Sequence, residues 1–234
     1  MTGTLINFVA IIAGSALGIL FGSRLSENLK MTVVAGMGLF TSAVGLQMFL
    51  KTENALVVLG ALIIGAVLGE WWALEDKLLA LGVWLEKRFS GGSGGNSSHF
   101  VSGFLTASVL FCTGPMGVLG SISDGLGGGY LTLSIKSVLD GITSIAFAST
   151  LGIGVAFSAL PVLAYQGLIS LLAAQLNSIM NTSMMNEMTA TGGVLLVGIG
   201  ISSLLEIKKI RVGNFLPALV IAPTIVYILN LIIK

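Results

Sequence analysis

Four polar residues recur at every fourth position of a segment that is otherwise mostly apolar. They are Thr132, Lys136, Asp140 and Ser144. A spacing of four places side chains on one face of a helix, so that the lysine and the aspartate can neutralise each other. Charged residues inside a membrane-spanning helix are costly and usually face a bundle interior or a water-filled cavity. The stripe therefore predicts the lining of a substrate or ion pathway; an ion pair that only joins helices is the alternative.

The segment before this stripe supplies six further candidates for the pathway: Thr113, Gly114, Pro115, Ser121, Ser123 and Asp124. A proline within an apolar run removes a helical hydrogen bond, and the freed carbonyl groups must be satisfied by protein or by water in a cavity. The glycine-rich run at 125–129 cannot continue a helix. We therefore expect a broken helix, in which 120–129 is either a plain loop or a re-entrant segment that returns toward the midplane.

The composition explains why such polar residues stand out. Of the 234 residues, 55% are hydrophobic and only 9% are charged, whereas about 25% of the residues in a soluble domain are charged. Apolar runs near 20 residues in length predict membrane-spanning helices. The expected fold is an all-α, polytopic transmembrane helix bundle. The net charge of +1 gives no reason to expect nucleic-acid binding, and no motif for a cofactor, a metal or a catalytic residue set occurs, so we expect no enzyme.

Eight spans are predicted, and the third is followed by a segment of a different kind. The amphipathic pattern of 71–89 favours a helix that lies in the membrane interface, and a Gly/Ser linker follows it up to residue 98. Single polar residues in the spans, such as Asn7 and Gln166, are expected to hydrogen-bond between helices. The spans lie at about 5–21, 31–50, 55–69, 100–119, 130–149, 152–176 (interrupted at Pro161), 190–205 and 215–233.

The basic residues orient these spans. With eight crossings, eight lysines and arginines fall on one side of the membrane and two on the other, while Lys136 lies inside it. Because cytoplasmic loops carry the excess of basic residues, both termini are predicted to lie outside the cytoplasm. If 71–89 crossed the membrane, the distribution would become five against five, which is why we place this segment in the interface.

Two parts of the chain resemble each other, and this suggests an internal repeat. The segments 34–50 and 189–205 align with Gly38 on Gly193 and Gly45 on Gly200, and each is followed by a charged linker and another apolar span. Five crossings separate the starts of the two copies, so their orientations would be opposite, as in many secondary transporters. A single integral membrane domain, 1–234, would then comprise a first repeat (1–70), the interfacial segment (71–98), central spans (99–150) and a second repeat (151–234).

Several segments resemble a known family. The first span, "GPMGVLGSISDGL", "KSVLDGITSIAFASTLGIGVAFSALPVLAYQG" and "MTATGGVLLVGIGISSLLEIKKIRVGNFLPAL" look like the YqgA/YdfK-like bacterial inner-membrane proteins, a family defined by a domain of unknown function. The resemblance covers essentially the whole chain. It implies a multi-pass protein of the bacterial plasma membrane, and it implies no substrate.

The functional hypothesis is a secondary transporter or channel for a small solute or ion. A cation or proton that reaches Asp140 would displace Lys136 and so couple ion and solute binding. The alternatives are a non-transporting scaffold or signalling partner that acts through 71–89, and a membrane-embedded enzyme that uses Asp124 and Asp140. The partners expected are the lipid bilayer, a small solute or ion and, through the small-residue stripe of Gly14, Gly18 and Gly22, a second copy in a homodimer.

Overall fold

The fold is described from a computed structural model, which describes residues 1–22, 26–89, 97–112 and 115–232. Two of the predicted pathway residues, Thr113 and Gly114, lie outside the described residues, as does 91–96 of the predicted linker. Within the described ranges the regular structure is entirely helical, which confirms the all-α prediction. Six helices are long and apolar enough to cross a membrane, and up to eight spans result if each of two bent helix pairs counts as one.

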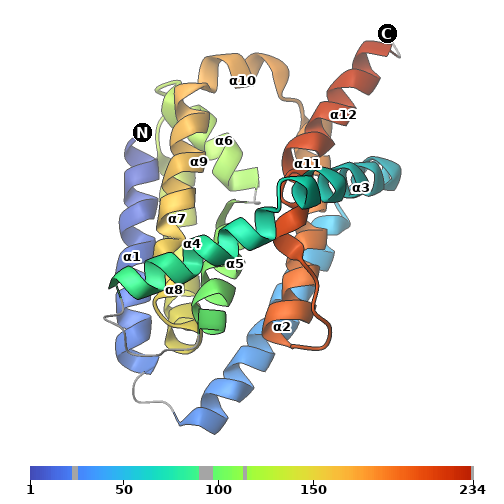
Figure 1. Cartoon of the computed structure of the whole chain (residues 1–234). Helices are drawn as coiled ribbons and strands as arrows, with labels where there is room; N and C mark the ends of the chain where they lie inside the picture. The colour runs from blue at the N-terminus through green and yellow to red at the C-terminus, as the bar shows by residue number, and fades with distance from the viewer. Residues whose placement is uncertain (23–25, 90–96, 113–114, 233–234) are drawn as a thin grey trace. The chain divides into compact units, whose positions relative to one another are not determined.

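Figure 1 labels the helices along the chain. Two short non-α segments flank the connection between α11 and α12: the π-helix η1 (Gly200–Leu204) and the 3-10 helix η2 (Val212–Phe215). The α-helices are α1 (Thr2–Gly22), α2 (Glu27–Phe49), α3 (Ala55–Trp71), α4 (Leu74–Phe89), α5 (Ser97–Cys112), α6 (Pro115–Gly125), α7 (Leu131–Leu151), α8 (Gly154–Phe157), α9 (Ala159–Leu171), α10 (Ala173–Ile179), α11 (Thr182–Ile199) and α12 (Ala218–Ile232).

The chain forms two compact units, each of which combines segments from both halves of the sequence. The first unit comprises Met1–Met37 and Leu79–Ser178, and the second comprises Gly38–Leu78 and Ile179–Lys234. The predicted repeat concerns equivalent segments of the sequence and not compactness, so the division into 1–70, 71–98, 99–150 and 151–234 stays a prediction.

In the first unit, α1 packs closely along α7, and Figure 1 shows the two helices beside each other. A Cβ on Gly14 would meet the carbonyl oxygen of Gly141, and a Cβ on Gly22 would meet that of Ser149. Glycines later in α1 contact residues later in α7, so the two helices run parallel. The small-residue stripe is therefore covered by α7 of the same chain, and a homodimer, which remains a prediction, would need another face.

The buried face of α1 is more polar than its exposed face. Thr4, Asn7 and Ser15 are fully buried, whereas Val9 and Leu20 are more than half exposed. A helix in lipid gains nothing from turning apolar groups inward, but it must turn polar groups away from the hydrocarbon. The pattern is that of a membrane helix whose polar side faces a protein interior.

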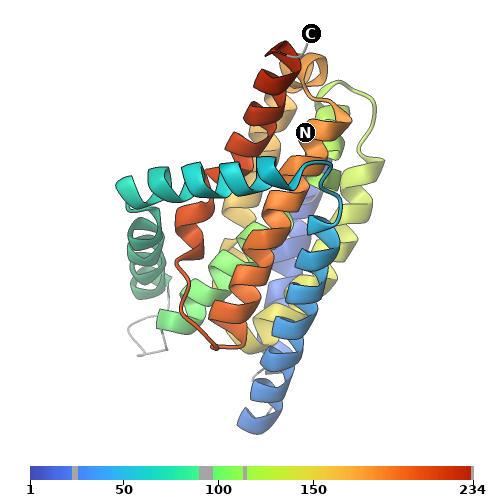
Figure 2. The same cartoon turned by 90° about the vertical axis from the view of Figure 1, so that its right-hand side faces the viewer.

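In the second unit, two helix pairs pack antiparallel. The second half of α2 lies on α11, where a Cβ on Gly45 would lie 2.5 Å from the Gly193 carbonyl oxygen, and Figure 2 shows α11 in orange beside α2 in blue. Helix α3 lies on α12 through a buried cluster of small residues, Ala61, Ala218 and Ala222. Small residues on both partners let the backbones approach closely, as is usual between membrane helices.

The broken spans differ in detail from the prediction. The predicted fourth span is two helices, because α5 ends at Cys112 and α6 begins at Pro115, with a bend of 63° between their axes. Proline is favoured at the first position of a helix, where its missing N–H has no partner in any case. Residues 120–125 continue α6, and an exposed turn follows, in which Gly127 and Gly129 have φ angles of 76° and 101°.

The predicted interruption of the sixth span lies at Ser158, between α8 and α9, and not at Pro161. Pro161 is the third residue of α9, and the first turn is the part of a helix where proline removes no hydrogen bond.

Candidate functional site

The stripe on α7 faces the interior of the first unit. Lys136, Asp140 and Ser144 are buried, with exposed fractions of 5%, 7% and 0%, and Thr132 at the start of the helix is half-buried. The Lys136 ammonium group donates a hydrogen bond to Asp140 Oδ2 and forms an ion pair with it. The Lys136 Nζ atom also lies 5.7 Å from the centroid of the Phe111 ring on α5, within the range of a cation–π contact.

A residue of α1 completes the contacts of the aspartate. Asn7 is fully buried, and its Nδ2 donates a hydrogen bond to Asp140 Oδ2 over 3.0 Å. The other atom of this amide, Oδ1, has no hydrogen-bond partner among the described residues. The close packing of α1 on α7 brings this amide, 133 positions away in the sequence, onto the carboxylate.

Helices α6 and α9 close the site on the side of the lysine. A Cβ on Gly117 of α6 would lie 3.4 Å from Lys136 Cε and 3.9 Å from Gln166 Nε2 of α9. Gln166 is fully buried, and neither atom of its amide has a partner among the described residues. We call Asn7, Gly117, Lys136, Asp140 and Gln166 the polar centre.

The polar centre contains more hydrogen-bonding capacity than its own contacts use. Lys136 can donate three hydrogen bonds and Gln166 two, while Asn7 and Gln166 each have a free carbonyl oxygen. The Ser144 hydroxyl, one turn along α7, has no partner among the described residues either. Buried polar atoms in native proteins almost always have partners. These atoms are therefore available for contact with water, an ion or a solute.

Three other predicted residues lie further along α6, and the contacts that the structure gives them are with residues outside the polar centre. Asp124, whose side chain is 5% exposed, accepts a hydrogen bond over 3.0 Å from the Gly3 N–H and lies 3.2 Å from the Met1 amino group. The Ser123 hydroxyl donates to the Gly129 carbonyl oxygen over 3.3 Å. Ser121 is buried, and its carbonyl oxygen accepts a hydrogen bond from Ser170. Pro115, the last of the predicted set, begins α6.

The sequence led us to expect that Asn7 and Gln166 hydrogen-bond between helices, as Asn7 does with Asp140, but it gave neither amide a place in the pathway and left Gly117 out. A single amide in an apolar helix carries no sign of its partner, and a glycine in such a helix usually permits close packing. The sequence holds one signal that both amides share: each stands alone among apolar neighbours on a helix rich in small residues.

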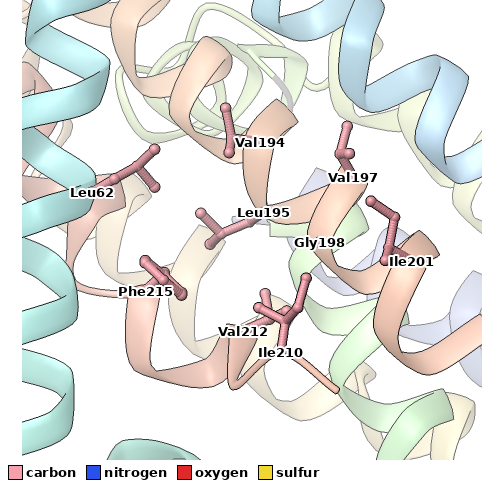
Figure 3. A pocket seen from close by; sticks show the side chains of 9 residues that line it. All are labelled: Leu62, Val194, Leu195, Val197, Gly198, Ile201, Ile210, Val212 and Phe215. Atoms are coloured by element: carbon pink, nitrogen blue, oxygen red, sulfur yellow. The ribbon is translucent and has the colours of Figure 1, made fainter. Parts of the chain in front are cut away.

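A pocket of the second unit contrasts with this site in the chemistry of its lining. The pocket has a volume of about 240 Å³, is partly open to the surface and has an apolar lining; Figure 3 shows the side chains that surround it. The lining residues come from α3, α11, the π-helix and the segment that leads into α12: Leu62, Val194, Leu195, Val197, Gly198, Ile201, Ile210, Val212 and Phe215. Among the residues that the structure describes, no group of three or more His, Cys, Asp or Glu side chains is placed to hold a metal ion.

Several charged residues of the second unit lie near helix ends and pair with one another or with polar neighbours. Arg211 donates hydrogen bonds to Glu70 over 2.7 Å and to Asp76 over 2.6 Å, and the hydrogen bond with Asp76 raises the pKa of the arginine. On the connection between α2 and α3, Glu53 accepts hydrogen bonds from Ser183 and Asn186, which lower the pKa of this exposed carboxyl group.

The comparisons with known proteins agree with the resemblance noted from the sequence. A family model described as "Protein of unknown function (DUF554)" matches residues 2–227. The uncharacterized membrane protein YdfK of Bacillus subtilis (strain 168) is 35% identical over 234 residues, which cover 98% of this chain and 97% of YdfK. The uncharacterized protein YqgA of Escherichia coli (strain K12) is 32% identical over 222 residues, 94% of each chain. No solved structure matches the chain.

Proposed function

The chain belongs to the DUF554 family of proteins of unknown function, and we propose that this multi-pass membrane protein is a secondary transporter or channel for a small solute or ion. We place it in the bacterial plasma membrane with both termini outside the cytoplasm. The observation that carries the proposal is the polar centre of the first unit. There, a buried ion pair and two buried amides leave hydrogen-bonding atoms unpartnered inside a bundle of membrane helices.

A charge pair that served only to hold helices together would be expected to have its hydrogen bonds satisfied. A buried ion pair adds little stability of its own, because removing both charges from water offsets their attraction. Close packing already joins α1 to α7 through Gly14, Gly18 and Gly22. The pair is therefore not needed to hold these helices together, and polar residues in a membrane interior usually mark a pathway.

The helix directions support the proposed topology. Helices α1 and α7 run parallel, as expected if three spans, α2, α3 and the bent pair α5–α6, cross between them. In the second unit, α2 and α11 would be the second and seventh spans, and α3 and α12 the third and eighth. In each pair the two spans would cross the membrane in opposite directions, as the antiparallel packing requires. A crossing by 71–89 would reverse α7 relative to α1. We therefore keep this segment in the interface in the proposal.

The same contacts support an inverted repeat. Under the alignment of Gly38 with Gly193 and Gly45 with Gly200, α2 packs antiparallel on its counterpart α11, and α3 packs antiparallel on its counterpart α12. The contact between Gly45 and Gly193 corresponds to one between Gly200 and Gly38, and a Cβ on Gly200 would indeed lie 3.0 Å from the Gly38 carbonyl oxygen. Two copies related by an axis in the membrane plane would make such reciprocal contacts, as secondary transporters do.

The test is a flux measurement that works for a solute of any identity. Proteoliposomes that have shrunk in a hyperosmotic medium swell again as solute enters, and light scattering follows the rate for a panel of small salts and neutral solutes. We expect the wild type to admit at least one of them, and Asp140→Asn to slow that solute by about tenfold or more, because this side chain can no longer pair with Lys136 or exchange a proton; a barrier higher by ~1.4 kcal/mol has this effect. Glu53→Gln, the same chemical change at an exposed loop position, is the control. Equal rates for wild type and Asp140→Asn would overturn the proposal.

A further inference from the structure

We propose that the polar centre binds a small monovalent oxyanion, such as a carboxylate or nitrate, together with one proton on Asp140. The inference rests on the proposed function, because it names the class of solute that the pathway would take. It follows from the position of the first turn of α6, from the unpartnered amide of Gln166 and from the charges that surround Lys136.

The first turn of α6 provides backbone donors. The N–H groups at the start of a helix have no acceptor within that helix, and this end of the helix favours negative charge. Helix α6 has 11 residues and begins at Pro115, so the N–H groups of Met116 and Gly117 belong to its first turn. The absence of a side chain at Gly117 leaves this turn bare toward Lys136, whose Cε would lie 3.4 Å from a Cβ at this position.

The side chain of Gln166 points to a ligand at the same place. It is fully buried, and its Nε2 would lie 3.9 Å from a Cβ on Gly117. An amide NH₂ group donates two hydrogen bonds, and neither has an acceptor among the described residues. An oxyanion beside Gly117 would accept hydrogen bonds from Gln166, from the first turn of α6 and from the Lys136 ammonium group. Half-helix starts in membrane transporters hold anionic groups in this way.

The charges around the site explain why the anion needs a proton. Lys136 and Asp140 together are neutral, so an anion alone would add an uncompensated buried charge. Among the described residues, the other titratable groups near the pair are Cys112 of α5, which interacts with both charges, and Tyr165 of α9, which interacts with Cys112. Both are neutral in their ordinary state at neutral pH. On α6 the one charged group, Asp124, is bound to the start of α1.

Protonation of Asp140 removes the uncompensated charge, and the added proton has a hydrogen-bond acceptor nearby. The carboxylate takes one proton from water, Asp140 becomes neutral, and Lys136 keeps one positive charge for the anion. The new O–H group can donate to Asn7 Oδ1, the atom of this amide that has no partner among the described residues, while Asn7 Nδ2 continues to donate to Asp140 Oδ2. The anion and the proton thus enter as a neutral pair.

The test measures binding of nitrate and formate to the full chain in lipid nanodiscs by isothermal titration calorimetry. Between about pH 8 and about pH 5.5 we expect the apparent affinity of the wild type for nitrate to rise about tenfold per pH unit, because one proton is taken up with each anion. Nitrate keeps its single charge throughout this range, so the dependence reports the protein. Asp140→Asn mimics the protonated state and should bind nitrate with an affinity that does not change with pH.

Two glycine-to-alanine substitutions test where nitrate binds. Gly117→Ala places a methyl group at ordinary contact distance from its neighbours, so the protein should fold, yet the methyl group covers the first turn of α6; we expect at least about tenfold weaker nitrate binding. Gly36→Ala, on a helix position with nothing within 4 Å, is the matched control and should bind as the wild type does. Gln166→Leu should weaken binding in the same way as Gly117→Ala.

Any of three results would overturn the inference. These are a nitrate affinity of the wild type that does not change with pH, a nitrate affinity of Gly117→Ala equal to that of the wild type, or a wild type that binds chloride but neither nitrate nor formate. The flux assay separates this inference from the proposed function. Nitrate binding without any flux supports the anion site and contradicts transport, whereas flux of a neutral solute without nitrate or formate binding supports transport and overturns the anion site.

Discussion

Both units use glycines to pack their membrane helices, parallel for α1 on α7 and antiparallel for α2 on α11, but the units differ in the polar groups that they bury. In both, glycines let helices meet at backbone distance: α1 on α7 in the first unit, and α2 on α11 in the second. The first unit buries an ion pair and unpartnered amides. Each unit also has a partly open apolar pocket, of about 240 Å³ in the second unit and about 250 Å³ in the first. Close packing is therefore the shared structural device, and the polar interior is the feature that needs a functional explanation.

One buried carboxylate from each unit, Glu187 and Asp140, shows the same difference in how fully polar groups are hydrogen-bonded. Glu187 of the second unit is 1% exposed and accepts three hydrogen bonds, from the Thr52 hydroxyl over 2.6 Å and from the backbone N–H groups of Glu53 and Asn54 over 2.7 and 2.9 Å. All three come from the connection between α2 and α3, so this carboxylate fixes a loop. Asp140 instead contacts a lysine and an amide, and each of these retains hydrogen-bonding capacity. The first arrangement is saturated, and the second is open to a ligand.

The largest expected effect comes from separating the ion pair. Lys136→Met leaves Asp140 buried without its counter-charge, and loss of one partner of a buried pair typically costs about 3–5 kcal/mol. We expect a large drop in the thermal unfolding temperature of the purified protein in detergent. Lys136→Met combined with Asp140→Leu removes both charges and should restore most of the loss. If the single substitution is as stable as the wild type, the pair is not buried as described.

The next effect tests whether the packing is shared. Gly14→Ala on α1 and Gly193→Ala on α11 each place a methyl group against a backbone carbonyl oxygen, that of Gly141 or of Gly45, and overpacking of this kind typically costs about 1–3 kcal/mol. Both should lower the unfolding temperature by similar amounts, while Gly36→Ala should not lower it. Destabilisation by only one of the two would show that the units differ in packing as well as in polarity.

An effect of similar size is expected from the saturated carboxylate. Glu187→Gln keeps the shape of the side chain but weakens three hydrogen bonds to a charged acceptor, and the loss should be about 1–3 kcal/mol in unfolding free energy. Nitrate binding measured at low pH should stay at the wild-type level, because Glu187 belongs to the other unit. Weaker nitrate binding in this variant would contradict the division between a structural and a functional carboxylate.

The all-α membrane fold and the ion pair of the polar centre could be predicted from the sequence. The parts of the site that could not be predicted were missed for physical reasons. The period of four on α7 predicts the ion pair because helix geometry fixes i,i+4 neighbours, and the structure brings Lys136 and Asp140 together. The sequence also grouped Asp124 with this pair. Asp124 lies seven residues beyond Gly117 on α6, which at 1.5 Å per residue is about 10 Å along the helix, and its contacts are with the start of α1.

The partners from other helices could not be predicted in this way. Asn7 reaches Asp140 only because α1 runs parallel to α7 in one register, and Gln166 reaches Gly117 only through the packing of α9 on α6. Such registers depend on which helices meet, and a period within one helix says nothing about the identity of its neighbour. The division of the chain into two compact units depends on the same long-range contacts.

The smallest effect concerns Glu53, the exposed neighbour of the saturated carboxylate, and it depends on pH. Hydrogen bonds from Ser183 and Asn186 lower the pKa of Glu53 in the folded protein. A carboxyl group with a lowered pKa in the folded state contributes stability above its unfolded pKa, and the contribution is lost as the pH falls through the folded pKa. The difference in unfolding temperature between wild type and Glu53→Gln should therefore be small but measurable at neutral pH and should vanish in acid. A difference that persists unchanged into acid would mean that the charge of Glu53 does not hold the connection between α2 and α3 to α11.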